Sequence, residues 1–362
     1  MKKLIIKITF LTIVVYGIIV SINYKVDPAN LYNDSVVSEM VDKLRSGEII
    51  EIPGDVDEGI FQEMMISSFE HVPDTVVIGS SHVMYIPWEF QDYYVAGLSG
   101  AFLGDYYAIV GILEKYDILP RRVIIGVDPW AFTKDITSGR HASIGMYAEY
   151  AYNCVYNQSQ DKVHMTIDVK TSWDKIKEIV SFSYFQSSLK KINENSLQYY
   201  MNEQTNMVEV ALDESVTDVV KILPNGRRIM KQSSFKTVEE NNATSQRAIE
   251  SKTVYQLEGG YSEVENIEYM EELVRYLLEK GITVELYLPS WYPKLWDCFE
   301  NEEQYRGILL VEEKIRSIGV KYGVTVHGTY NPYDAGIEED DFADWLHLKP
   351  EKMLENYNLI VE

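Results

Sequence analysis

The stretch DTVVIGSSHVMYIP, residues 74–87, indicates the fold class of this 362-residue chain. Val76, Val77 and Ile78 form a short apolar run, which is typical of a strand buried on both faces of a sheet. The run ends at Gly79, and two serines and a histidine follow at once. Because ligands bind beyond the carboxyl ends of the strands in open α/β sheets, this strand end is a candidate site.

Strand-like and helix-like segments alternate after this stretch. Strands are predicted at 75–80, 93–100, 121–129, 282–289 and 323–328, helices at 104–117, 262–281 and 301–319, and a last helix is predicted to begin at Pro350. This alternation predicts parallel strands joined by crossover helices. We therefore expect an α/β protein, with a three-layer α/β/α sandwich around one parallel sheet.

The alternation stops between residues 133 and 255, which are polar, rich in tyrosine and irregular. We expect a large insertion here, after the third strand, with one helix at 181–204. The tyrosine-rich segment 148–158 roofs the site in one interpretation and is an inert structural lid in another. With residues 25–70 as a lead-in segment, the main domain is expected to span residues 71–362.

The N-terminus begins with Lys2 and Lys3 and then runs apolar over residues 4–22, interrupted mainly by Lys7. At about 1.5 Å per residue, a helix of this length spans roughly the 30 Å of a bilayer hydrocarbon core. No A-x-A cleavage motif follows, so residues 1–24 are expected to be an uncleaved signal anchor, with a cleaved signal peptide as the alternative. Because a positive N-terminus stays inside, the rest of the chain is expected outside the cytoplasm.

The composition excludes some partners and leaves others open. A formal net charge of −23 argues against a nucleic-acid surface. The 27 tyrosines and 6 tryptophans suit contacts with a glycopolymer, although such residues also fill protein cores. Cys154 and Cys298 match no metal spacing, and they either pair or stay free. No metal and no cofactor is expected.

A serine becomes a good nucleophile when a histidine accepts its proton and a carboxylate orients that histidine. Among the six histidines, His347 follows Asp344 by three residues, a spacing at which the two side chains approach one another on one turn. In the alternative interpretation, Asp344 caps a helix and His347 is a surface neighbour. His82 directly follows Ser81, and its side chain is expected to point away from that of Ser81.

The blocks VVIGSSH (76–82) and DWLH (344–347) together resemble the SGNH (GDSL-like) hydrolase superfamily. The resemblance covers residues 70–132 and 265–360, and it implies an SGNH/flavodoxin-like fold. It further implies Ser81 as the nucleophile, His347 as the base and Asp344 as the acid that orients the base.

GLSGA, residues 97–101, resembles the glycine-bearing block of the same superfamily. The resemblance implies an oxyanion hole made by the N–H groups of Ser81 and Gly100. The next strand end, GVDPWAF (126–132), departs from the family pattern because no asparagine stands there. This departure leaves a third oxyanion donor unassigned. One such donor is worth about 10²–10³ in rate.

Four more residues are predicted to build the pocket around these blocks: Ser80, His82, Asp128 and Trp130. The competing α/β-hydrolase fold is excluded, because its G-x-S-x-G motif requires a glycine where Val83 stands.

Within the superfamily, the chain resembles the membrane-anchored branch that contains teichoic-acid D-alanylation and alginate O-acetylation proteins. This resemblance implies an extracytoplasmic serine esterase or O-acyltransferase that acts on acyl groups of a cell-envelope polymer. It also implies a membrane-bound O-acyltransferase as partner. Two other hypotheses remain, a non-catalytic SGNH-like protein that binds or assembles a polymer and a structural component of the envelope.

Overall fold

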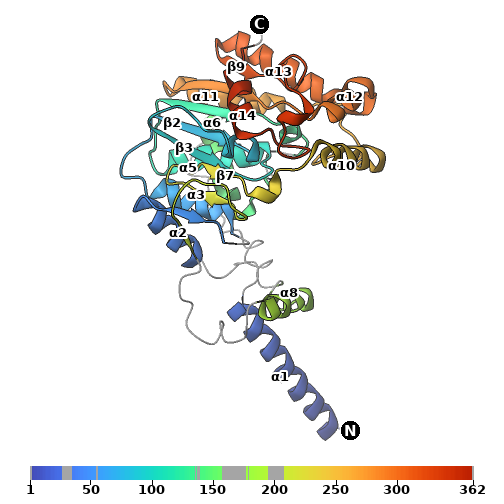
Figure 1. Cartoon of the computed structure of the whole chain (residues 1–362). Coiled ribbons are helices and arrows are strands. Elements are labelled where there is room, and N and C mark those ends of the chain that lie inside the picture. Colours follow the sequence, from blue (N-terminus) through green and yellow to red (C-terminus); the bar gives the residue numbers. More distant parts are fainter. Residues whose placement is uncertain are drawn as a thin grey trace.

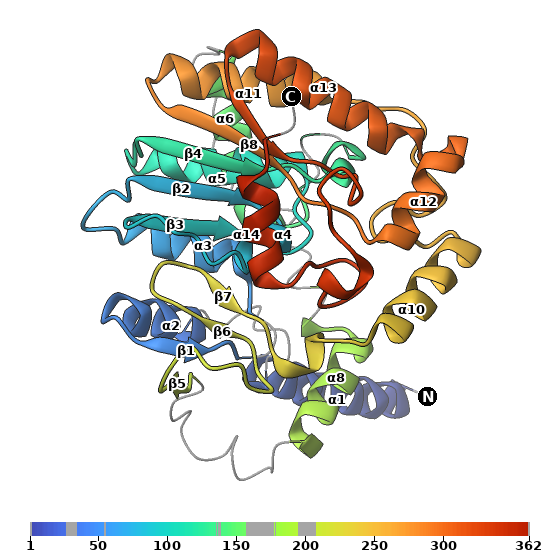
Figure 2. The same ribbon diagram turned by 45° about the horizontal axis from the view of Figure 1, so that its top comes forward.

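A computed structural model describes residues 2–26, 35–53, 56–134, 136, 139–156, 177, 179–194 and 208–360 (Figure 1). A five-stranded parallel sheet with the order β3-β2-β4-β8-β9 forms the centre of the molecule (Figure 2). Its strands are Thr75–Gly79 (β2), Tyr93–Gly97 (β3), Arg122–Gly126 (β4), Thr283–Leu288 (β8) and Thr325–Gly328 (β9). The predicted parallel α/β sheet and its five strands are confirmed.

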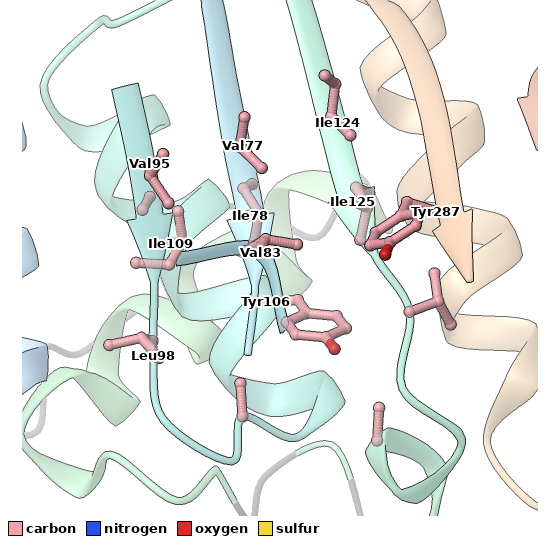
Figure 3. Close-up of a cluster of buried hydrophobic side chains, with 14 of the residues drawn as sticks. Val77, Ile78, Val83, Val95, Leu98, Tyr106, Ile109, Ile124, Ile125 and Tyr287 are labelled. Atoms are coloured by element: carbon pink, nitrogen blue, oxygen red, sulfur yellow. The ribbon is translucent and has the colours of Figure 1, made fainter. Parts of the chain in front are cut away.

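The strand that opened the sequence analysis lies in the middle of the core. Every residue of β2 is buried, which explains why its sequence is continuously apolar rather than alternating. Figure 3 shows Val77 and Ile78 of β2 among Ile124 and Ile125 of β4 and Val83 of the short helix that follows β2. Burial of such aliphatic side chains stabilises a fold by about 1.5–3 kcal/mol each.

Helices follow the strands as the alternation predicts. They are Ser81–Met84 (α4), Leu103–Lys115 (α5), Ile267–Glu279 (α11), Pro293–Asn301 (α12), Arg306–Tyr322 (α13) and Pro350–Asn358 (α14), and the 3₁₀ turns Pro129–Phe132 (η1) and Glu303–Tyr305 (η5) lie between them. The last helix begins at Pro350 as predicted. The helix predicted at 301–319 begins later, at Arg306, because α12 and η5 occupy the preceding residues.

The sequence leaves open whether segment 148–158 roofs the site or forms an inert structural lid. Its residues 148–155 belong to α6 (Gly145–Val155), which packs along α5, and Tyr156 is the C-cap of that helix. Ala148, Ala151 and Val155 of α6 are buried. Gly111 of α5 permits this close approach, since a Cβ there would lie 2.0 Å from the carbonyl oxygen of Tyr147. This part of the predicted insertion is therefore a helix with one face packed against α5, and residues 157–158 lie outside the described residues.

A second, antiparallel sheet with the order β5-β1-β6-β7 joins the lead-in segment to the predicted insertion. Its strands are Ile49–Glu51 (β1), Val210–Ala211 (β5), Lys221–Ile222 (β6) and Arg228–Ile229 (β7). The turn between β6 and β7 reaches the edge of the main sheet, where the N–H of Val95 in β3 donates to the carbonyl oxygen of Asn225 at 2.8 Å. The small sheet thereby covers part of an edge that would otherwise be open to pairing.

Further described elements are the helices Ser35–Arg45 (α2), Glu58–Ser67 (α3) and Val238–Ser251 (α10), together with the 3₁₀ turns Ala142–Ile144 (η2), Gln232–Ser234 (η4) and Glu339–Asp341 (η6). The described residues between 133 and 255 are therefore less irregular than expected. Strands of two or three residues carry no detectable periodicity, which is why the sequence does not predict them. Neither Cys154 nor Cys298 forms a disulfide bond.

The N-terminal helix α1 (Lys2–Val26) projects away from the rest of the molecule (Figure 1). Its segment Thr9–Val26 is long and apolar enough to cross a membrane, by length and composition. Helix α8 (Phe182–Glu194) lies beside the C-terminal end of α1. It is the described part of the helix predicted at 181–204, and residues 195–204 lie outside the described residues.

Candidate active site

Ser81 stands at a sharp turn between β2 and α4. The chain leaves β2 at Gly79, and Ser80 is in extended conformation with its Oγ accepting the N–H of His82 at 3.2 Å. This N-cap bond starts the helix at Ser81. A Cβ on Gly79 would approach a methyl group of Val83 to 3.0 Å, so the turn is tight. Ser80 is fully buried, whereas Ser81 is half-buried.

The structure brings together the three residues that the resemblance singles out. Ser81 Oγ lies 2.8 Å from Nε2 of His347, a residue 266 positions away in the sequence. The other ring nitrogen, Nδ1, lies 3.0 and 2.9 Å from the two carboxylate oxygens of Asp344. Because the Asp344 carboxylate accepts a hydrogen bond from Nδ1–H, Nε2 carries no proton and can accept the hydroxyl proton of Ser81.

Asp344 also builds the turn that presents the histidine. Its Oδ1 accepts the backbone N–H groups of Leu346 and His347, both at 2.8 Å. Burial alone raises the pKa of Asp344, but the His347 ring and these two N–H groups outweigh burial and hold the pKa below its usual value. The capping interpretation and the orienting interpretation of Asp344 thus describe two contacts of one carboxylate.

His82 and Asp128 form a second, deeper pair beneath these residues. His82 Nδ1 lies 2.6 Å from Asp128 Oδ1, and its Nε2 lies 3.0 Å from the carbonyl oxygen of Leu346. Both partners are acceptors, and both ring nitrogens donate at once only in the imidazolium form. Burial lowers the pKa of His82, but the Asp128 carboxylate outweighs burial and the net shift is upward.

This pair connects two strand ends to the loop that carries His347. The rings of His82 and His347 lie with centroids 5.1 Å apart, and Leu346 directly precedes His347. The ring nitrogens of His82 thus bond Asp128 and Leu346 and not the Ser81 hydroxyl, and these contacts support the loop that carries His347. The pairing was detectable in principle, because His82 and Asp128 both follow the carboxyl ends of adjacent strands.

The four residues predicted to line a pocket are all buried: Ser80 at 0%, His82 at 6%, Asp128 at 1% and Trp130 at 1% exposure. They lie under the site and do not form an open wall of it. Trp130 donates its indole N–H to the carbonyl oxygen of Ala101 at 3.2 Å, and its ring lies 5.5 Å from that of His82. These four side chains therefore belong to the closely packed strand ends.

Gly100 lies at a position that only glycine occupies without strain. Its φ is +61°, and a Cβ would lie 2.5 Å from Tyr255 Oη and 2.9 Å from Arg140 Nη1. In the described part of the chain, the backbone N–H groups of Ser81 and Gly100 make no hydrogen bond. They are therefore available to hold an oxyanion. Arg140 and Tyr255, which the sequence does not predict, bring two further donors to this turn.

The Glu58–Arg228 ion pair, which the sequence does not predict, holds the Gly100 turn through the neighbouring Ser99. Glu58 at the start of α3 accepts the N–H of Ser99 at 2.6 Å and its hydroxyl at 2.8 Å. Arg228 of β7 donates to the same carboxylate at 2.7 Å. Burial raises the pKa of Glu58, but Arg228 and the Ser99 N–H outweigh it and lower the pKa. No local signal connects residues 170 positions apart.

Substitution of Gly100 by alanine is expected to reduce turnover of an activated ester by about 10²–10³-fold, the effect of losing one oxyanion donor. The added Cβ displaces the turn that carries the N–H group. Gly323→Ala is the matched control, because Gly323 has a similar φ of +67° but open space around its α-carbon. The left-handed backbone costs each variant about 1–2 kcal/mol of stability, and only Gly100→Ala adds a clash with Tyr255 and Arg140. Equal loss of turnover in both would contradict a role for Gly100 in the site.

No group of His, Cys, Asp and Glu residues within the described ranges is arranged to hold a metal ion. Comparisons of the chain with protein-family models, with curated proteins and with solved structures found no match. What the protein does is therefore inferred from the chemistry of the Ser81 site and its surroundings.

Proposed function

We propose that this protein is a membrane-anchored serine acyl hydrolase or acyltransferase of the SGNH type. The observation that carries the proposal is the hydrogen-bonded chain from Ser81 Oγ to His347 Nε2 and from His347 Nδ1 to Asp344. A serine whose hydroxyl faces a histidine of fixed tautomer is the arrangement that activates serine for attack on a carbonyl.

The order of the main sheet supports the SGNH/flavodoxin-like fold. Numbered by their sequence order, its strands run 2-1-3-4-5, which is the flavodoxin-like order. In such sheets the ligand site lies where the strand order reverses, between the first and third strands. Ser81 follows the first of these strands and Asp128 the third. The three-layer arrangement of helices on both faces of the sheet is part of the same proposal.

The chemistry proceeds in two acyl transfers. His347 takes the proton of Ser81 as Oγ attacks the carbonyl carbon of an ester or thioester, and the N–H groups of Ser81 and Gly100 hold the oxyanion. His347 then gives the proton to the leaving oxygen or sulfur, which leaves an acyl group on Ser81. Water or a polymer hydroxyl next gives its proton to His347 and attacks the acyl group, and the proton returns to Ser81 Oγ.

The proposed substrate is an acylated cell-envelope polysaccharide or teichoic-acid-like polymer, with a membrane-bound O-acyltransferase as partner. This part follows from the resemblance of the two sequence blocks and from the apolar helix α1. With Lys2 and Lys3 inside, α1 anchors the chain and places the Ser81 site on the extracytoplasmic side. Release of the acyl group to water defines an esterase, and release to a hydroxyl of the polymer defines a transferase.

Labelling by a fluorophosphonate probe, which reacts with activated serines, tests the proposal. The full-length protein in detergent is expected to be labelled, and Ser81→Ala is expected to abolish the label. Ser317→Ala is the control, because the hydroxyl of Ser317 is exposed on α13 and bonds only the carbonyl oxygen of Glu313. A folded protein that takes no label, or Ser81→Ala that keeps it, would favour the non-catalytic polymer-binding hypothesis.

A further inference from the structure

Helix α8 is attached to the last turn of α1. Asn23, three residues before the end of α1, is fully buried. Its side-chain N–H₂ donates to the carbonyl oxygens of Ile179 at 2.7 Å and Ser181 at 3.3 Å. The hydroxyl of Ser188 donates back to Asn23 Oδ1 at 3.0 Å. One amide therefore holds both the start and the middle of α8 against α1.

The two sides of α8 differ in what they contact. Ser188 faces α1, and Tyr184 one turn earlier is buried as well. Phe182, Phe185 and Leu189 follow the i, i+3, i+7 spacing of a single helix face, which we call the α8 apolar face. Phe182 is 63% and Leu189 45% exposed, and Phe185 is half-buried. An exposed apolar face of this kind indicates an interaction site.

The position of α8 relative to α1 identifies the occupant. The membrane-crossing segment of α1 ends at Val26. Asn23 lies about 4.5 Å before that end, at a rise of 1.5 Å per residue. Tyr24 and Lys25, which adjoin Asn23, are exposed residues of the types that anchor helices at a membrane–water boundary. An interfacial helix buries its apolar face about 5–10 Å into the boundary between headgroups and acyl chains. The attachment of α8 close to the end of the apolar segment suits such a position.

Other features favour lipid over protein at this face. Figures 1 and 2 show α8 lying across α1, close to the C-terminal end of α1. A helix across the spanning segment lies in the plane of the membrane. Large apolar side chains of α1, such as Phe10 and Leu11, are more than 60% exposed, as is Phe182 of α8.

We propose that α8 is an interfacial helix whose apolar face inserts into the outer boundary of the lipid bilayer. This proposal goes beyond the catalytic function and shares with it only the membrane position of α1. Two contacts with the membrane, one spanning and one lying in the surface, fix the orientation of the chain where it leaves the bilayer. A single spanning helix would leave it free to rotate.

Depth-dependent quenching tests this proposal on the full-length chain. Phe182→Cys and Leu189→Cys, each in a Cys154→Ser/Cys298→Ser background, are labelled with an environment-sensitive fluorophore and reconstituted into phosphatidylcholine vesicles. Ser187→Cys is the matched control, because Ser187 is exposed and lies on the side of α8 opposite the apolar face. Brominated acyl chains are expected to quench the labels at 182 and 189 severalfold more than the label at 187.

A fourth label, at Val14→Cys in the middle of α1, separates the two membrane contacts. Quenching at residue 14 with equal or no quenching at residues 182, 187 and 189 would overturn the α8 proposal and leave the anchor in place. Absence of quenching at all four positions would overturn both. Fluorophosphonate labelling of Ser81 reports on the catalytic function independently of either outcome.

Discussion

Replacement of His347 by glutamine is expected to reduce hydrolysis of an activated ester by about 10⁴-fold or more, with little change in the stability of the fold. Glutamine retains much of the size of the histidine but cannot accept the Ser81 proton. Since His347 Nε2 lies 2.8 Å from Ser81 Oγ, the variant loses the base and keeps the serine. The measurement is kcat/KM for an activated ester such as p-nitrophenyl acetate, together with thermal unfolding.

His71→Gln is the matched control for that variant. His71 also bonds a carboxylate, Asp92, at 3.0 Å, but its side chain is 81% exposed, and it precedes β2 whereas Ser81 follows the other end of that strand. Its replacement is expected to leave kcat/KM unchanged. Retention of most activity in His347→Gln would remove the base from the mechanism, even if Ser81 were still labelled by the probe.

Replacement of Asp128 by asparagine is expected to destabilise the protein by about 3–5 kcal/mol, the cost of leaving a buried charge unpaired. Asp128 is the carboxylate partner of His82 at 2.6 Å, and both side chains are buried. The substitution retains the shape of the side chain and removes its negative charge. His82 then loses the group that stabilises its imidazolium.

The pH dependence of that loss follows from the direction of the pKa shift. The pKa of His82 is raised in the folded protein, so the stability it contributes is fully present below its unfolded pKa of about 6.5. That contribution is lost as the pH rises through the folded pKa. The difference in unfolding free energy between wild type and Asp128→Asn is therefore expected to be largest below pH 6.5 and to shrink at higher pH.

Denaturant unfolding of both proteins over the range from about pH 5.5 to 9 measures this difference. Groups that titrate in both proteins cancel in the comparison, so the remaining slope reports on the His82–Asp128 pair. A difference that stays constant with pH, or that grows as the pH rises, would show that His82 is not held as an imidazolium by Asp128.

Several parts of the fold were predictable because they depend on neighbouring residues. The continuous apolar run of β2, the glycine that ends it and the serines after it are local features, as is the three-residue spacing of Asp344 and His347. The position of Pro350 likewise predicted where α14 begins, because proline suits the first turn of a helix. Each of these predictions needed only a few adjacent positions.

Other parts depend on contacts between distant residues. The Glu58–Arg228 ion pair joins the lead-in segment to a two-residue strand inside the predicted insertion, and α6 packs on α5 although its sequence is polar and tyrosine-rich. Buried Asn23 connects α1 to α8 across more than 150 positions. None of these contacts leaves a periodic pattern in the sequence.

By itself, then, the sequence determined the parallel α/β sheet, the apolar N-terminal helix and the identity of the residues that meet in the candidate site. The tertiary structure decided that His347, and not His82, bonds the Ser81 hydroxyl. It also decided that the buried His82–Asp128 pair supports the loop that carries His347. The physical reason is that strand periodicity and short-range spacing act along the chain. Which ring faces which oxygen is settled only when the strand ends and the last loop pack together.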